Sequence, residues 1–282
     1  MSIDVRAMMV PEPVVVPRRA ITAVLFGCIV ALSIASFAGQ ISTYVFGYPF
    51  LMGAVPLFYV DLEGNLPTWY QATVFMFAAL LVFCIHLLER RRQSRYAAHW
   101  LLLGCLLVAL SIDEASQLHE LTMEPLSRWI GRLEGAWRPM WVILGIAAVA
   151  VVGAFYLGFF LHLDRRERIH VVLAGALFVG GAVGVEMATA AMYEVYEPKL
   201  KLSLRYAVMA HIEELAEMLG LWVFVDFLLL RLSRLAPLTV MVTTRTRTGA
   251  MDFAPLETSR ARHHGYRQTY AQAVSRDLQG RD

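Results

Sequence analysis

The sequence has 282 residues, of which 58% are hydrophobic and 17% are charged, and its mean hydropathy is +0.55. This composition is too apolar for a soluble domain, which must cover its surface with polar groups, and it predicts a membrane protein in contact with a lipid bilayer. The net charge of +2 is nearly balanced, which excludes a strongly basic protein that binds nucleic acid. The sequence also lacks motifs of common soluble enzymes, such as GxSxG, a phosphate loop or HExxH.

Six apolar stretches each approach the roughly 20 residues that cross a hydrocarbon core. They are residues 20–43, 68–88, 100–119, 140–162, 170–192 and 206–230. The predicted fold class is therefore all-α, a polytopic membrane helix bundle of about six transmembrane helices. The first stretch ends in small residues, as a cleavable signal peptide does, but its apolar part is long for a signal and we predict a retained helix.

Positive charges predict the orientation of these helices, because arginine-rich loops stay in the cytoplasm. Arginines follow the second, fourth and sixth stretches, at Arg90, Arg91, Arg92, Arg95, Arg165, Arg166, Arg168, Arg231, Arg234, Arg245 and Arg247. Both termini are then cytoplasmic, and an apolar pattern within 121–139 indicates a helix lying along the outer surface. We predict a cytoplasmic N-terminal segment 1–19, a transmembrane domain 20–232 and a flexible cytoplasmic tail 233–282.

Acidic and histidine side chains interrupt three of the predicted helices. The third helix ends in SIDEASQLHE (111–120), the fifth contains Glu186, and the sixth begins with HIEELAEM (211–218). With a rise of 1.5 Å per residue, these acids lie about 9 to 12 Å inside the outer ends of their helices. A common depth predicts one shared site, and its candidate residues are Asp113, Glu114, His119, Glu186, His211, Glu213, Glu214 and Glu217.

Helical spacing refines this prediction. In an ideal helix Asp113, Gln117 and Glu120 share one stripe, whereas His119 points elsewhere. On the sixth helix Glu213, Glu217 and Gly220 share a face, and the glycine would let another helix approach closely.

The energetics of buried charge suggest what the site binds. Each ionised carboxylate at this depth costs roughly 2.5–3.5 kcal/mol on insertion scales, and the spans offer almost no arginine or lysine to offset it. The first hypothesis is therefore a metal site with one or two Fe, Mn or Zn ions, redox-active or hydrolytic. The usual Glu-x-x-His pair of di-metal helix bundles is replaced here by the reversed order of His211 and Glu214.

Two alternatives stay open. Acids and histidines inside a membrane also mark proton- or cation-coupled transporters and channels, although only His86 and Asp226 continue the series toward the cytoplasm. The cluster would otherwise serve as a structural element, in a homo-oligomer or in an accessory subunit of a membrane complex. The sequence does not decide whether the protein is an enzyme.

The two acidic segments carry SxDExxxLHE-type and EExxExxG-type helix motifs, at 111–120 and 213–220. These motifs resemble those of a family of bacterial multi-pass membrane proteins of uncharacterised function. The resemblance implies a bacterial inner membrane, with the acids near the periplasmic face, and it brings no activity with it.

Overall fold

The computed structural model describes residues 17–196 and 203–235, which all belong to one structural unit. Among these residues every regular element is a helix, so the all-α prediction is confirmed. Most of the predicted N-terminal segment 1–19, and the tail beyond residue 235, lie outside the described residues.

Five helices are long and apolar enough to cross a membrane. They are α1 (Arg18–Tyr44), α3 (Leu66–Arg91), α4 (Ala97–Ser116), α7 (Trp141–His162) and a continuous helix built from α8 (Arg165–Val179), η3 (Gly180–Val185) and α9 (Glu186–Tyr196). These helices are those of a multi-pass membrane protein, as the sequence predicted. The sixth predicted span corresponds to α10 (Leu204–Leu235), which is not among these five and which contains Glu213, Glu214, Glu217 and Asp226.

Short helices connect the spans at one end of the bundle. η1 (Leu51–Gly53) and α2 (Ala54–Phe58) follow α1, while α5 (Leu118–Leu121), α6 (Met123–Ile130) and η2 (Gly135–Trp137) follow α4. The helix predicted within 121–139 is therefore present as α6. Its Trp129 side chain is 86% exposed, so this helix presents an apolar surface outward.

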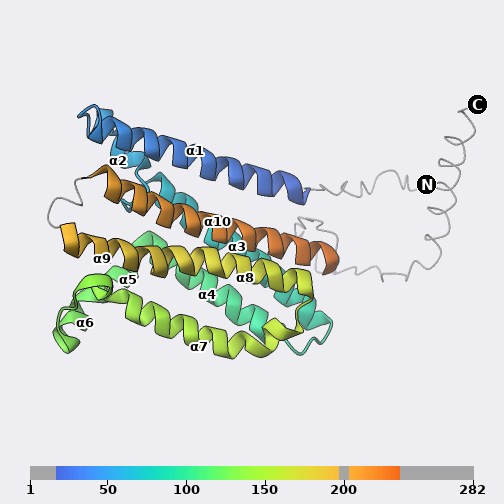
Figure 1. Cartoon of the computed structure of the whole chain (residues 1–282). Helices are drawn as coiled ribbons and strands as arrows, with labels where there is room; N and C mark the ends of the chain where they lie inside the picture. Colours follow the sequence, from blue (N-terminus) through green and yellow to red (C-terminus); the bar gives the residue numbers. More distant parts are fainter. Residues whose placement is uncertain (1–16, 197–202, 236–282) are drawn as a thin grey trace, which may run out of the picture. The chain divides into compact units, whose positions relative to one another are not determined.

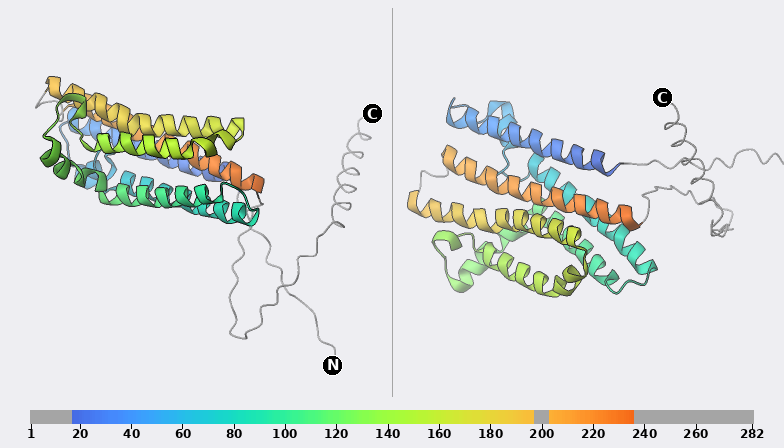
Figure 2. Two further views of the ribbon diagram at one scale, coloured as in Figure 1. Left: turned by 90° about the horizontal axis from the view of Figure 1, so that it is seen from below. Right: turned by 45° about the vertical axis from the view of Figure 1, so that its right-hand side comes forward.

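Helix α10 is the centre of the arrangement. It packs against α1 on one side and against α8, η3 and α9 on the other, and it also contacts α3 (Figure 1). α3 pairs with α4, and Figure 2 shows from two further sides that the long helices run alongside one another. Buried side chains from α3, α4 and α10 form the core, among them Val82, Ile85, Trp100, Val225 and Leu228. α10 thus contacts most of the other long helices.

Two glycines bring α10 close to the α8–α9 helix. A Cβ on Gly220 would lie 2.6 Å from the backbone nitrogen of Phe178, and one on Gly181 would lie 2.8 Å from the carbonyl oxygen of Glu213. Neither position has room for a larger residue, so the prediction that Gly220 permits close approach is confirmed. Gly181 lies in η3, a π-helix that leads directly into Glu186 at the start of α9.

The two ends of the bundle differ in charge. At the first, which we call the arginine end, Arg18, Glu89, Asp164, Glu167, Asp226, Arg231 and Arg234 form ion pairs. At the second, the acidic end, the α2–α3 loop, the end of α4 and the start of α9 and of α10 come together (Figure 1). All the candidate site residues belong to elements of the acidic end.

Candidate metal site

Three neighbouring groups of polar side chains occupy the acidic end. The histidine group consists of Glu63, Asp113, His119 and Glu120; the glutamine group of Gln71, Glu114, Glu214 and Glu217; and the tyrosine group of Asp61, Glu186, Tyr206 and Glu213.

A break in the helix creates the histidine group. α4 ends at Ser116 because Gln117 adopts a left-handed conformation, with φ 57° and ψ 38°, and the chain turns before α5. This turn brings His119 back onto Asp113, whose carboxylate accepts a hydrogen bond from the backbone N–H of His119 at 2.7 Å. The carboxylate also lies 3.1 Å from the imidazole Nδ1. The expectation that His119 points away from Asp113 is wrong, because it assumed an unbroken helix.

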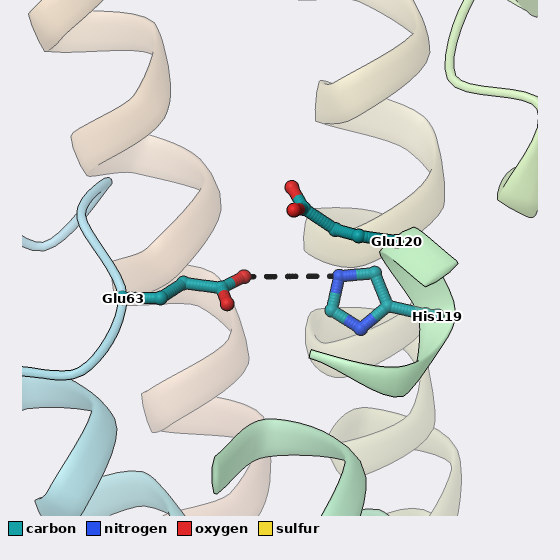
Figure 3. A group of neighbouring side chains, drawn as sticks. All are labelled: Glu63, His119 and Glu120. Carbon is teal, nitrogen blue, oxygen red and sulfur yellow. Dashed lines mark ion pairs between the residues drawn. The ribbon is translucent and has the colours of Figure 1, made fainter. Parts of the chain in front are cut away.

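The other face of His119 meets two further carboxylates. Its Nε2 lies 3.9 Å from Glu63 Oε1, which comes from the α2–α3 loop, and Glu120 stands beside it on α5 (Figure 3). One donor atom from each of Glu63, His119 and Glu120 lies within 4.8 Å of the others. Because the Asp113 carboxylate contacts Nδ1, the ring presents Nε2 to Glu63 and Glu120. Histidine ligands of metals are commonly oriented by a carboxylate in this way.

The electrostatics of this group favour a positive charge. Burial and the nearby charge of Glu120 raise the pKa of Glu63. Burial alone would lower the pKa of His119, but the hydrogen bond and charge of Asp113 outweigh it, so the pKa of His119 is raised. The imidazole side chain is 29% exposed and therefore reachable from solvent. The surrounding carboxylates therefore favour a positively charged imidazole.

The glutamine group lies where α3, α4 and α10 meet. Gln71 Nε2 donates to Glu114 Oε2 at 3.2 Å and to Glu217 Oε2 at 3.1 Å. Gln71 is only 2% exposed, and its Oε1 is buried without a hydrogen-bond partner. Glu214 lies within electrostatic range of both glutamates. Among the described residues, no arginine forms an ion pair with any of these three acids.

The tyrosine group joins α9 and α10 to the loop after α2. The Tyr206 hydroxyl donates to Asp61 Oδ1 at 3.3 Å. The carboxyl groups of Glu186 and Glu213 lie within hydrogen-bonding reach of each other. The close approach at Gly181 brings these two side chains together.

Seven of the eight residues predicted to share one site are distributed over the three groups. His119 contributes to the set of potential metal donors, with Asp113 behind it, while Glu114, Glu214 and Glu217 lie in the glutamine group. Glu186 and Glu213 form a pair in the tyrosine group. The eighth, His211, lies apart: its ring packs on Phe37, with centroids 5.9 Å apart, and its buried Nδ1 has no hydrogen-bond partner among the described residues. Metal binding by any of these residues stays a prediction.

The residues predicted from the sequence omit five members of the groups, namely Asp61, Glu63, Gln71, Glu120 and Tyr206. The acids Asp61 and Glu63 lie in a loop, where acidic residues are ordinary and give no signal. Gln71 was detectable, because an amide in an apolar span needs hydrogen-bond partners. Glu120 was visible in the acidic motif, but the ideal-helix stripe separated it from His119.

The match to a known family covers most of these elements. The family model described as "Domain of unknown function (DUF8692)" matches residues 18–232, from the start of α1 to the last turns of α10. No curated protein and no solved structure matches the chain.

Proposed function

The chain belongs to the DUF8692 family, and we propose that it is an integral membrane protein that binds a divalent metal ion at its acidic end. Glu63, His119 and Glu120 would hold the ion. One observation carries this proposal: three potential ligand atoms lie within 4.8 Å of one another, and Asp113 holds the ring nitrogen that faces away from them. Orienting a ligand in this way is the usual role of an outer carboxylate in a metal site.

The ligand chemistry narrows the choice of metal. One imidazole and two carboxylates suit Zn, Fe or Mn, whereas sites for Mg or Ca are built from oxygen alone. Three protein ligands leave coordination positions for water, as in catalytic rather than structural zinc sites. The bound ion would lower the pKa of a coordinated water molecule and would therefore be available for hydrolytic chemistry.

We further propose six spans, with α10 as the sixth and the arginine end in the cytoplasm. α10 has 32 residues and packs alongside α1, α3 and α8. The exposed arginines that follow α3 and α7, such as Arg91 and Arg165, support this orientation. Both termini would then be cytoplasmic, and the metal would bind near the periplasmic face of a bacterial inner membrane.

Contacts of α1 support its retention as a span. Arg18 forms an ion pair with Asp226, and Trp222 Nε1 donates to the carbonyl oxygen of Thr22 at 2.9 Å. The Tyr70 hydroxyl donates to the carbonyl oxygen of Leu25 at 3.0 Å. A signal peptide that is cut away would have no need of such contacts with α3 and α10.

Cation or proton transport is a second candidate, because acids extend from the surface inward to Glu114 and Glu217. The series does not continue along α10. The next acid on that helix, Asp226, is in an ion pair with Arg18. His86, the other residue expected to extend a relay, has its Nδ1 2.8 Å from the carbonyl oxygen of Ala97. A site at one end is the better supported function.

Elemental analysis of the full chain, purified in detergent, tests the metal proposal. We expect near-stoichiometric Zn, Fe or Mn in the wild type and its loss in His119→Ala and in Glu63→Gln/Glu120→Gln. Glu124→Gln is the matched control, because Glu124 is an exposed acid of α6 whose carboxylate pairs with Arg128. A metal-free wild type that binds none of the three ions on addition would overturn the proposal. Ion-driven flux in proteoliposomes that survives His119→Ala would favour transport instead.

A further inference from the structure

The buried amide of Gln71 is unusual because only one of its two polar atoms is used. Nε2 contacts carboxylate oxygens from two other helices, Glu114 on α4 and Glu217 on α10. Oε1 belongs to the same planar amide, and it is buried without a hydrogen-bond donor among the residues that the structure describes. A buried acceptor without a donor is unfavourable, and native structures keep few of them. The amide of Gln71 therefore donates hydrogen bonds to both carboxylates, while its own oxygen accepts none from the described residues.

A half-turn of the amide would exchange these two atoms. Oε1 would then take the place of Nε2, facing Glu114 Oε2 and Glu217 Oε2 at distances near the present 3.2 and 3.1 Å. With Oε1 at that distance from each carboxylate oxygen, the oxygens repel one another unless a cation lies among them. Neighbouring oxygens around a metal with bonds of about 2.1 Å are separated by about 3 Å, so the spacing fits such an ion.

We propose that Gln71, Glu114 and Glu217 form a second cation site, deeper than the histidine group and sharing no ligand with it. In the absence of the ion, Nε2 bridges the two acids. When the ion arrives, the amide turns and Oε1 becomes its third ligand. Glu214, within electrostatic range of both acids, adds further negative charge.

The ligands determine which cation this site prefers. All three donors are oxygens, two of them from carboxylates, and such sites favour the hard ions Mg²⁺, Mn²⁺ and Ca²⁺. The histidine group, with its imidazole, prefers Zn²⁺ or Fe²⁺. The acidic end would then hold two different ions, one at the surface and one between α3, α4 and α10.

A purely structural role for Gln71 makes the opposite prediction for one substitution. Gln71→Glu removes the N–H donor and places a third carboxylate between two others. If the amide only bridges the acids, this variant loses stability and gains nothing from a cation. If the amide is a ligand, the variant binds the cation more tightly, because a charged oxygen replaces a neutral one.

The test is Mn²⁺ binding to the detergent-purified full chain, with free Mn²⁺ counted by electron paramagnetic resonance and thermal unfolding measured in parallel. We expect two Mn²⁺ per wild-type chain. Glu217→Gln should lose one and His119→Ala should lose the other. Gln71→Glu should bind its inner Mn²⁺ at least about tenfold more tightly than the wild type, and Mn²⁺ should raise its unfolding temperature.

The variants separate failure of this site from failure of the histidine group. Loss of one Mn²⁺ in Glu217→Gln supports the deeper site whether or not His119→Ala changes anything. Unchanged Mn²⁺ binding in both Glu217→Gln and Gln71→Glu would overturn it. If Glu217→Gln does not fold, Gln71→Glu decides alone: failure of Mn²⁺ to bind it more tightly, or to raise its unfolding temperature, would likewise overturn the site.

Discussion

The two ends of the helix bundle contain the same kind of group, carboxylates gathered from several helices, but in opposite surroundings. At the arginine end Glu167 is fully buried and accepts from Arg231 NH1 at 3.0 Å through both of its oxygens. Glu89 accepts from the same guanidinium at 2.7 Å. One arginine therefore joins α3 and α8 to α10 through two buried carboxylates, of which Glu167 also pairs with Arg234.

The glutamine group at the acidic end is different. In the part of the chain that the structure describes, no arginine forms an ion pair with Glu114, Glu214 or Glu217, and Glu114 and Glu217 share a neutral amide instead. Our proposal explains this contrast by a positive charge that comes from outside the chain, as a metal ion or a proton.

The largest expected effect is at the arginine end. Arg231→Met should destabilise the protein by about 3–5 kcal/mol, because it leaves Glu89 and Glu167 without their shared cation. Unfolding in detergent, by heat or denaturant, measures this loss. Arg234→Met is the control and should cost less, because Arg234 is more exposed. Equal stability of wild type and Arg231→Met would show that the carboxylates of the arginine end do not depend on this arginine.

The acidic end should respond to metal rather than to arginine. Zn²⁺ at a hundred times its dissociation constant should stabilise the wild type by about 2.7 kcal/mol, and a chelator should reverse this. His119→Ala should show neither effect, while Arg231→Met, wherever it folds, should retain both. Thermal unfolding with and without Zn²⁺ is the measurement. Identical Zn²⁺ responses in wild type and His119→Ala would show that the stabilisation by Zn²⁺ does not come from the histidine group.

Replacement of Asp113, which orients the imidazole, should weaken metal binding less than replacement of His119, the ligand itself. Asp113→Asn should weaken Zn²⁺ binding by about 10–100-fold, because a neutral amide replaces the charged carboxylate that orients the ring. Isothermal titration calorimetry measures the change. Glu124→Gln should bind Zn²⁺ as the wild type does. Binding by Asp113→Asn that equals the wild type would show that Asp113 does not support the site.

Metal binding should also depend on pH. A protonated imidazole has no lone pair for a metal, so affinity should fall by about tenfold per pH unit below the pKa of His119. Because Asp113 raises that pKa against the effect of burial, the fall should begin at a higher pH than for an ordinary histidine, near 6.5. Zn²⁺ titrations across this range measure it. Asp113→Asn should shift the fall to lower pH, and a pH-independent affinity would contradict the prediction.

The smallest effect concerns the start of α8. Asp164 accepts from the backbone N–H of Glu167 at 2.9 Å, and this hydrogen bond lowers the pKa of Asp164. Asp164→Ala should cost about 1 kcal/mol, whereas Asp164→Asn keeps the cap and should cost less. The contribution of the carboxylate is present above its unfolded pKa and is lost as the pH falls through its lower folded pKa. Unfolding curves of both variants at neutral and acidic pH test this order.

The fold was predictable to the extent that apolar length decides it. Every predicted span has a corresponding helix, and Gly220 was recognised as a close-contact position because its spacing is local. The site was not predictable in the same way. The break at Gln117 depends on a left-handed backbone that is rare for glutamine, and it decides that His119 meets Asp113.

Long-range pairing was the second limit. Glu63 and His119 are far apart in sequence, and nothing in the loop before α3 indicates that Glu63 faces α5. Gln71 was overlooked because a single amide in an apolar helix is a weaker sequence signal than seven acidic residues. Depth along the helices correctly indicated which end of the bundle to examine, and only the packing of α3, α4, α5 and α10 assigned the side chains to groups.

The π-helix η3 holds one more residue than an α-helix of the same length would hold. An α-helix turns by about 100° per residue and the wider π-helix turns by less, so the additional residue leaves the rotation of α9 about its axis nearly unchanged. Deletion of one residue from Gly180–Val185 would therefore restore α-helical bonding and leave Glu186 beside Glu213. We expect relatives that lack the additional residue to keep this acid and to show a one-residue gap within η3.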